Sequence, residues 1–313
     1  MTQEIIKETF TPNQQSGIRI DKLLAENFAN VPRENFKKAI KNGDVLVNGK
    51  KIKPNYVTGE HDKIEINIIF EKKIITALPD SSVEINVIYQ HPDFLIIEKP
   101  SRISAHPSDK ERLGTLANGL LSKFPQTKNV GENPLRPGSV HRLDKYTSGI
   151  LIVPLTQPSF DFFKLLFKNR QISKKYTAVC WGIPDKEEGI IESFIGRSHS
   201  NPLKQATSKN SNKVGNAKKA ITEYRLLKKS SDETKSLILA TLKTGRKHQI
   251  RVHLQSIGNP VVGDKMYQPE KLKIANQDFT RFLLHASNLS FTYSDGKKYQ
   301  FESPLPKQFT KFF

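Results

Sequence analysis

The sequence predicts an α+β protein with a mixed, largely antiparallel β-sheet, preceded by a small α/β unit. Three observations support this. After residue 83, strand-like runs outnumber helical segments and do not alternate strictly with them, which disfavours a parallel sheet. Residues 17–70 carry a separate pattern of two short helices and a hairpin. The 313 residues are enough for two cores. We therefore expect domains over 1–72 (core 17–70) and 83–313, joined by a linker over 73–82.

In the N-terminal unit, apolar residues recur at helical spacing over 19–28 and 31–40. Asn48-Gly49 then separates an apolar run over 45–47 from 50–52, a strong hairpin signal, and 63–68 alternates as a strand. Basic residues occupy the exposed positions of this unit, and such a face either binds a polyanion or is merely solvated. The basic residues of interest are Arg33, Lys37, Lys38 and Lys50.

In the larger part, we expect strands over 94–98, 149–154, 176–181 and 236–242. Helices are expected over 159–169 and 247–257, the second ended by Gly258-Asn259-Pro260.

Charge narrows the class of partner. The 50 Lys and Arg exceed the 31 Asp and Glu, giving a net charge of +19. A polyanionic partner follows, and nucleic acid is favoured because no long amphipathic helix suited to a membrane surface is evident. The polar, lysine-rich stretch 198–219 is then either a mobile insertion facing RNA or a simple solvated loop.

Cys180 is the only cysteine, which excludes an intramolecular disulfide, a cysteine-based zinc site and an iron–sulfur cluster. The N-terminus lacks a signal-peptide pattern, and the longest apolar runs are too short to cross a bilayer. We expect a cytoplasmic protein.

Three segments could carry chemistry. In the first, Asp144 lies between basic residues in a turn that precedes an apolar strand. It is either a catalytic carboxylate or a residue whose side chain caps the turn.

The second segment, 242–254, reads as a strand end followed by a helix whose first N–H groups can hold an anion. Arg251 lies on this helix, and an arginine paired with an acid keeps that acid ionised. His248 and His253 are five residues apart, a poor spacing for a metal. In the third segment, Tyr176 either stacks on a base or belongs to the core.

The sequence lacks two common nucleotide- and cofactor-binding motifs. Residues 258–265 echo a phosphate-binding loop, but Asp264 stands where lysine is needed, and no Gly-x-Gly-x-x-Gly pattern is present. We expect no metal and no cofactor.

Together with Leu284-His285-Ala286 and Lys99-Pro100, these segments occur in the order seen in pseudouridine synthases of the RluA/RluD type, which the chain resembles. Those enzymes modify uridines in ribosomal and transfer RNA. Residues 17–70 resemble the S4 RNA-binding domain, except that Glu60-His61-Asp62 replaces its usual Gly-Asp.

The resemblance implies roles for individual residues. Asp144 would be the catalytic aspartate, Arg251 its partner, and Tyr176 the residue that stacks on the target base. Arg142 would hold the RNA after base extrusion, Leu284 would line the pocket, and Arg246 would contact a phosphate. We also expect His141, Lys99 and the four basic residues of the S4-like unit to contact RNA.

The implied reaction isomerises uridine to pseudouridine without consuming anything. Asp144 would attack C1′ of the ribose, attack C6 of the base, or assist loss of the C2′ proton to form a glycal. Large-subunit ribosomal RNA is the favoured substrate, with transfer RNA as the alternative. A non-catalytic RNA-binding or ribosome-assembly factor on the same fold is the competing interpretation. We expect a monomer that does not act on DNA.

Overall fold

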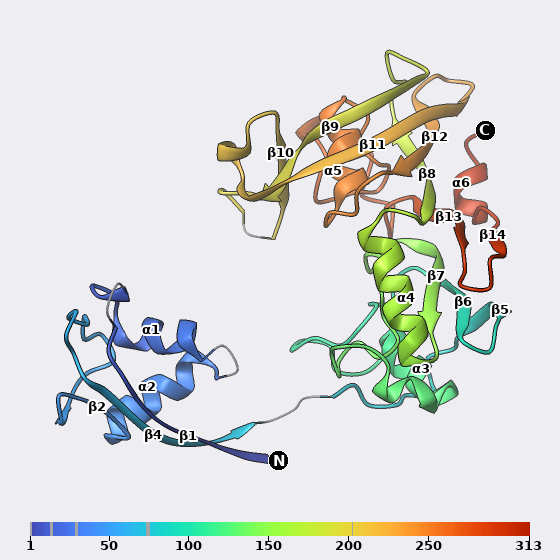
Figure 1. Cartoon of the computed structure of the whole chain (residues 1–313). Helices are drawn as coiled ribbons and strands as arrows, with labels where there is room; N and C mark the ends of the chain where they lie inside the picture. Colours follow the sequence, from blue (N-terminus) through green and yellow to red (C-terminus); the bar gives the residue numbers. More distant parts are fainter. Residues whose placement is uncertain (1, 13–14, 29–30, 73–75, 202) are drawn as a thin grey trace. The chain divides into compact units, whose positions relative to one another are not determined.

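A computed structural model of the chain divides into two units, Met1–Ile75 and Thr76–Phe313 (Figure 1). It describes residues 2–12, 15–28, 31–72, 76–201 and 203–313. In the described residues, no helix is both long and apolar enough to cross a membrane.

The smaller unit is a four-stranded antiparallel sheet, in the order β1-β4-β2-β3, with two helices on one face (Figure 1). Its elements are β1 (Thr2–Phe10), α1 (Ile20–Asn27), α2 (Arg33–Asn42), β2 (Val45–Val47), β3 (Lys50–Lys51) and β4 (Ile64–Lys72). Leu24 of α1 and Phe36 of α2 share one buried cluster with Ile64 of β4. The predicted helices, hairpin and strand are therefore present.

Two features of this region differ from the sequence prediction. Strand β1 was not expected; it pairs with β4 along its whole length, and Ile5 on it is exposed, which weakens the apolar alternation that would have marked it. The expected linker over 73–82 is shorter. Residues 73–75 lie outside the described part. Ala77 N donates to Pro134 O, and Asn118 Nδ2 donates to Leu78 O. Residues 76–82 therefore belong to the larger unit.

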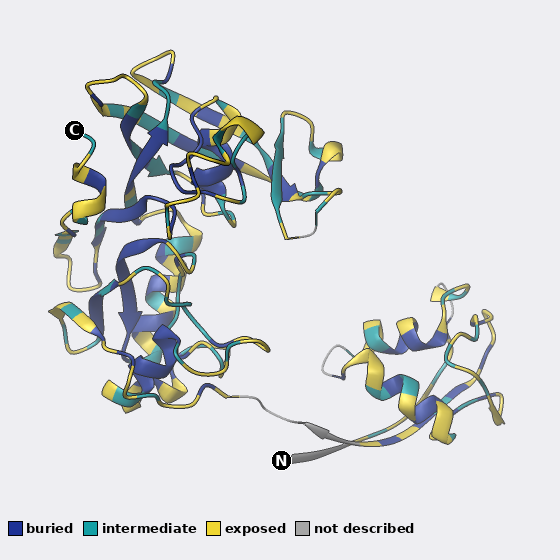
Figure 2. Cartoon of the chain, turned by 180° about the vertical axis from the view of Figure 1, so that it is seen from behind, coloured by how far each residue is buried: buried dark blue, intermediate teal, exposed yellow. Residues whose placement is uncertain are grey.

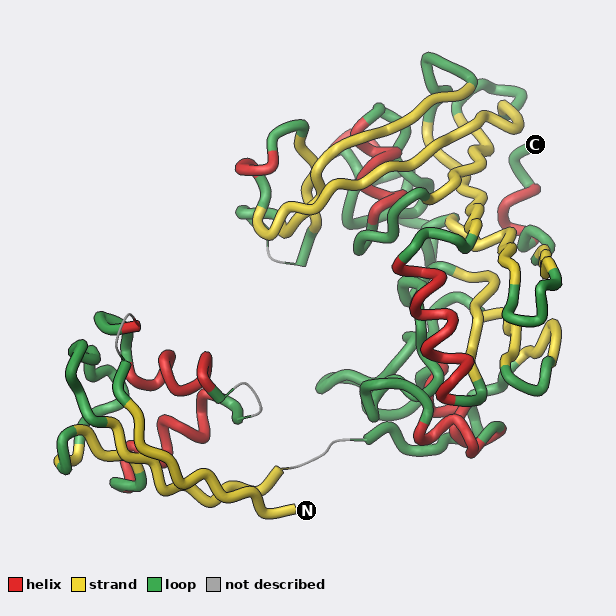
Figure 3. The backbone as a smooth tube through the Cα atoms, in the orientation of Figure 1, coloured by secondary structure: helices red, strands yellow, loops and turns green. Residues whose placement is uncertain are grey.

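The larger unit is built on a ten-stranded sheet in the order β10-β9-β11-β12-β8-β13-β7-β6-β5, with β14 paired to β13. Figure 3 shows the strands of this unit in yellow. Only the β13–β7 pair is parallel among the described strands. The predicted α+β class with a largely antiparallel sheet is confirmed. Its strands are β5 (Asn86–Gln90), β6 (Phe94–Lys99), β7 (Ser148–Pro154), β8 (Ser173–Trp181), β9 (Glu188–Arg197), β10 (Gln205–Ser208), β11 (Gly215–Lys229), β12 (Lys235–Leu242), β13 (Leu284–Thr292) and β14 (Lys298–Glu302).

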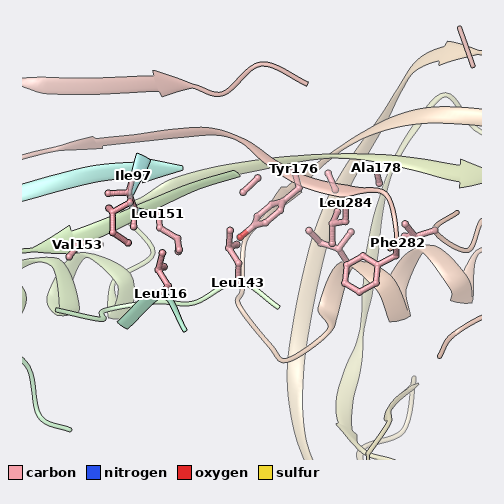
Figure 4. Packing of buried hydrophobic residues seen from close by; sticks show 14 of the residues in the cluster. Ile97, Leu116, Leu143, Leu151, Val153, Tyr176, Ala178, Phe282 and Leu284 are labelled. Carbon is pink, nitrogen blue, oxygen red and sulfur yellow. The ribbon is translucent and has the colours of Figure 1, made fainter. Parts of the chain in front are cut away.

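Strand β7 is buried on both faces, as its uninterrupted apolar run requires. Ile150 and Ile152 point into an aromatic cluster with Phe163 of α4, while Leu151 and Val153 point into the cluster that contains α3. Figure 2 shows the central strands buried between these layers, and Figure 4 shows the second cluster. The helices of this unit are α3 (Leu116–Lys123), α4 (Gln157–Lys168), α5 (Gln249–Ser256) and α6 (Lys307–Thr310).

The stretch 198–219 is more ordered than a mobile insertion. It contains β10 and the start of β11, and these two strands pair with opposite edges of β9. Val214 is buried beside this start, and Ala220 is buried just beyond it. Small polar residues can form these strands because pairing with β9 supplies their backbone hydrogen bonds. An apolar run in their own sequence is not needed.

Candidate active site

The loop that carries Asp144 is held by a buried side chain and by a backbone hydrogen bond. Leu143 is buried in the main core cluster, and the Asp144 backbone carbonyl accepts a hydrogen bond from Thr147 N at 3.0 Å. The backbone closes this turn, so the Asp144 side chain does not serve as its cap. That carboxylate is instead about one quarter exposed (23%) and projects into a cavity.

Gly149 permits the strand arrangement behind this loop. Its φ is +114°, and a Cβ there would lie 2.2 Å from the Ala286 carbonyl oxygen. Glycine is thus required where β7 runs parallel to β13, directly after the Asp144 turn.

Arg251, on α5, connects two carboxylates. Its Nη1 donates to Asp144 Oδ2 at 3.2 Å, while Nε and Nη2 donate to Asp264 Oδ2 and Oδ1 at 2.6 and 2.9 Å. Burial disfavours the charge on Arg251, but hydrogen bonding to Asp264 and the charges of both acids outweigh it and raise its pKa. Arg251 therefore stays cationic beside Asp144, whose Oδ1 has no hydrogen-bond partner among the described residues.

Asp264 is the residue that the sequence reasoning missed. Asp264 is buried, and its Oδ1 also accepts hydrogen bonds from Met266 N and Tyr267 N. These backbone contacts fix the carboxylate in the position from which it binds Arg251. The preceding Gly263 has φ +78°, and a Cβ there would lie 2.2 Å from Arg281 O. The sequence signal is Gly263-Asp264, which the sequence shows only as part of a failed phosphate-binding loop.

The cavity above Asp144 has a volume of about 940 Å³. Its lining includes Asp144, Arg251, Tyr176, Leu284, Arg142 and Arg246. Figure 4 shows the ring of Tyr176 between the side chains of Leu143 and Leu284. Burial, together with the Asp144 charge, raises the pKa of Tyr176, so its phenol remains protonated at neutral pH.

A second neighbour of Asp144 is His248, which the sequence reasoning considered only as a metal ligand. Its Nε2 lies 3.9 Å from Asp144 Oδ2, and its Nδ1 lies 2.7 Å from the Tyr267 hydroxyl. Gln205 N donates to the same hydroxyl oxygen at 2.8 Å. Burial lowers the pKa of His248 to about 4, so the ring is neutral at pH 7.

Helix α5 begins at Gln249, two residues later than expected, because His248 adopts a left-handed conformation with φ 57°. Gln249 Oε1 accepts from Arg246 N and Thr244 Oγ1, so side-chain contacts already satisfy part of this turn. The Arg246 side chain donates through Nε to Lys219 O on β11 and remains on the cavity wall.

Two residues expected to contact RNA make hydrogen bonds to the backbone around the Asp144 loop. Lys99 is fully buried, and its Nζ donates to the carbonyls of Pro100, Ile103 and Lys145, with burial lowering its pKa to about 7. His141 Nε2 accepts from Ile152 N at 2.9 Å, and burial lowers the pKa of His141 to about 3. Both side chains hold the Asp144 loop rather than offer a cation to a ligand.

The basic residues of the smaller unit divide into two groups. Arg33 pairs with the buried Asp21 at 2.8 Å, and Lys37 pairs with Glu34 at 2.6 Å. Lys38 and Lys50 are exposed and make no ion pair with any residue that the structure describes. The second pair is therefore the freer to meet a polyanion.

Comparison with known proteins identifies the family. Residues 93–256 match the family described as RNA pseudouridylate synthase, and residues 18–64 match the S4 domain. An "Uncharacterized RNA pseudouridine synthase" of Chlorobaculum parvum is 36% identical over 307 residues, covering 94% of this chain and 92% of that protein. A "Ribosomal large subunit pseudouridine synthase D" of Borreliella burgdorferi is 34% identical over 310 residues, covering 98% and 92%.

Among solved structures, human RNA pseudouridylate synthase domain containing 1 aligns with a TM-score of 0.59 at 27% identity, covering 72% of this chain and 85% of that chain. The chain belongs to the RNA pseudouridylate synthase family and carries an S4 domain, as the resemblance in its sequence implied. It is an isomerase that converts uridine in RNA to pseudouridine.

Proposed function

We propose that the chain modifies uridines of large-subunit ribosomal RNA and that Asp144 is its catalytic aspartate. The observation that carries this proposal is the Asp144 carboxylate in the 940 Å³ cavity, with Oδ2 held by Arg251 and Oδ1 free. Several relatives that align over most of the chain are named ribosomal large subunit pseudouridine synthase D, which supports the choice of RNA.

The target base must leave its stack before its glycosidic bond can reach Asp144, and this costs a few kcal/mol. Stacking on an aromatic side chain returns about 1–3 kcal/mol per base. Tyr176 offers that platform on one wall of the cavity, and Leu284 extends it with an apolar surface. Arg142, exposed at the cavity edge, holds the strand from which the uridine was extruded.

Attack on C1′, attack on C6 and abstraction of the C2′ proton all require an ionised carboxylate at the bottom of this cavity. Arg251 places a positive charge 3.2 Å from Asp144 Oδ2, and the ion pair with Asp264 holds Arg251 in that position. Burial and the Asp144 charge raise the pKa of Tyr176, so a neutral phenol lies beside the base; in the glycal route we propose that it relays the proton that C5 loses and N1 gains, so that no proton is consumed overall.

The test is Asp144→Asn, which preserves shape and removes the charge. We expect no pseudouridine from a ribosomal RNA transcript and RNA affinity within a few-fold of wild type, since backbone contacts supply the binding. Asp185→Asn, in an exposed turn, is the matched control and should retain full activity. Normal product formation by Asp144→Asn would remove Asp144 from the mechanism.

We further propose that the chain acts in the cytoplasm as a monomer and on RNA alone. Light scattering should give a mass near 35.5 kDa, and single-stranded DNA of the same sequence should not be modified. A stable dimer or modified DNA would contradict these two statements.

A further inference from the structure

A second cavity of about 320 Å³ opens beside the catalytic one. Arg142 lines both cavities, and it lies two residues before Asp144 on the same loop. The opposite side of the second cavity is formed by Arg136 and by the segment 104–108, which contains His106. Any strand that delivers a nucleotide to Asp144 and passes Arg142 meets this cavity next.

The charge in this cavity is largely uncompensated. Lys145 pairs with Glu111 at 2.9 Å, whereas Arg136 and Arg142 have no carboxylate partner among the residues that the structure describes. Two unpaired guanidinium groups on one small cavity repel each other and attract an anion. The planar fork of arginine fits phosphate oxygens better than a point charge does.

His106 orients one of these guanidinium groups. Its Nε2 lies 3.3 Å from Arg142 Nη1, and a guanidinium can only donate, so His106 Nε2 is the acceptor. Burial and the charges of Arg142 and Arg136 lower the pKa of His106 to about 4, so the ring stays neutral and adds no third positive charge. His106 thus fixes the Arg142 fork at the boundary between the two cavities.

We propose that the second cavity is a phosphate-binding subsite in which Arg136 and Arg142 together hold one backbone phosphate of the RNA, next to the nucleotide extruded toward Asp144. This inference rests on the proposed function. It adds Arg136 to the binding residues and gives Arg142 a specific ligand. Holding this phosphate fixes the strand while the base is outside its stack.

The experiment measures binding of the full chain to an RNA oligonucleotide that contains its target uridine, at several salt concentrations. Arg136→Gln should weaken binding about 5- to 10-fold and reduce the slope of log K against log salt by about one, as for one lost phosphate contact. Arg136→Lys should retain most of the slope. Arg225→Gln, the same charge change at an exposed position of β11 that lines neither cavity, is the control.

The location of the phosphate is tested by replacing the phosphates near the target uridine, one at a time, with uncharged methylphosphonates. At one position, the replacement should weaken wild-type binding 5- to 10-fold and Arg136→Gln binding by a smaller factor, because only Arg142 still holds the phosphate in the variant. Equal losses at every position in both proteins, or an unchanged salt slope, would refute the subsite. Pseudouridine formed by wild type from the unmodified oligonucleotide is scored separately, so a failure of the proposed function is distinguishable.

Discussion

Arg251 is shared by two carboxylates that differ in what else they bind. Asp264 is saturated by Arg251 and two backbone N–H groups, whereas Asp144 receives one hydrogen bond and keeps one oxygen free. The first arrangement suits a fixed support and the second a reacting group. We therefore infer that Asp264 is a positioning residue, which holds Arg251 in contact with Asp144.

Asp264→Asn should therefore reduce both stability and activity. It leaves Arg251 charged and buried without its main partner, which typically costs about 3–5 kcal/mol. Urea unfolding should show this loss, and product formation should fall further than the unfolded fraction explains. Asp278→Asn, at an exposed position, should change neither quantity. An Asp264→Asn variant as stable as wild type would show that Arg251 is held by other contacts.

Buried neutral histidines should make the protein sensitive to acid. His253 is fully buried between Ser193 and Thr222, and burial lowers its pKa to about 4, below the ordinary value of 6.5. As pH falls below 6.5, the unfolded chain takes up a proton that the folded chain refuses, so stability is lost until about pH 4.

From pH 7 to pH 5, this residue alone should cost about 2 kcal/mol of unfolding free energy. His253→Gln should lose correspondingly less over the same range, as measured by denaturant unfolding at each pH. Parallel pH profiles for the two proteins would count against a neutral, buried His253.

Single residues also show the limit of sequence prediction. Asp144 and Arg251 were selected by their local motifs, but they are 107 residues apart, and only the family resemblance suggested that they pair. The buried position of Lys99 could not be foreseen, because its three carbonyl partners come from irregular segments that have no sequence pattern.

Among the elements, β7 links the fold to the site most directly. It is buried on both faces, follows the Asp144 turn and makes the parallel pair with β13. Gly149→Ala places a Cβ against the Ala286 backbone at positive φ, which should destabilise the chain by about 2–5 kcal/mol through overpacking and backbone strain.

The control for this change is Gly296→Ala, also at positive φ (+77°) but with no atom within 4 Å of the added Cβ. It should lose only the backbone component, about 1–2 kcal/mol. Thermal unfolding of both variants compares the two costs. Equal shifts would mean that the β7–β13 contact tolerates a side chain.

Elements with a clear period were predicted well, namely α1, α2, the 48–49 hairpin and the strands β6, β7, β8 and β12, which carry apolar runs. The sequence analysis named none of β1, β5, β9, β10, β11, β13 and β14 as a strand. The clearest cases are β1 and β10. Their sequences offer little apolar alternation, and what stabilises them is pairing with β4 and β9, respectively, which a local pattern does not contain.

For the molecule as a whole, the net charge of +19 serves two separate tasks. Exposed residues such as Lys38 and Lys50 on the S4 domain suit salt-dependent binding, whereas Arg251 lies buried beside the Asp144 carboxylate. Removing residues 1–75 should therefore weaken binding to full ribosomal RNA, reduce the salt slope and blur site choice.

The same truncation should leave the rate on a short, saturating substrate nearly unchanged, because Thr76–Phe313 contains the whole cavity. Affinity measured over a salt series and single-turnover rates separate these two effects. Equal activity of the truncated and full proteins on complete ribosomal RNA would show that the S4 domain is dispensable for recognition.

We infer that Asp144 converts particular uridines of large-subunit ribosomal RNA. The most direct test of this inference is pseudouridine mapping at single-nucleotide resolution in cells without the gene, complemented with wild type or with Asp144→Asn. We expect a small set of large-subunit positions to lack pseudouridine in cells without the gene and to regain it only when the wild-type protein is supplied. An unchanged map without the gene, or restoration by Asp144→Asn, would contradict it.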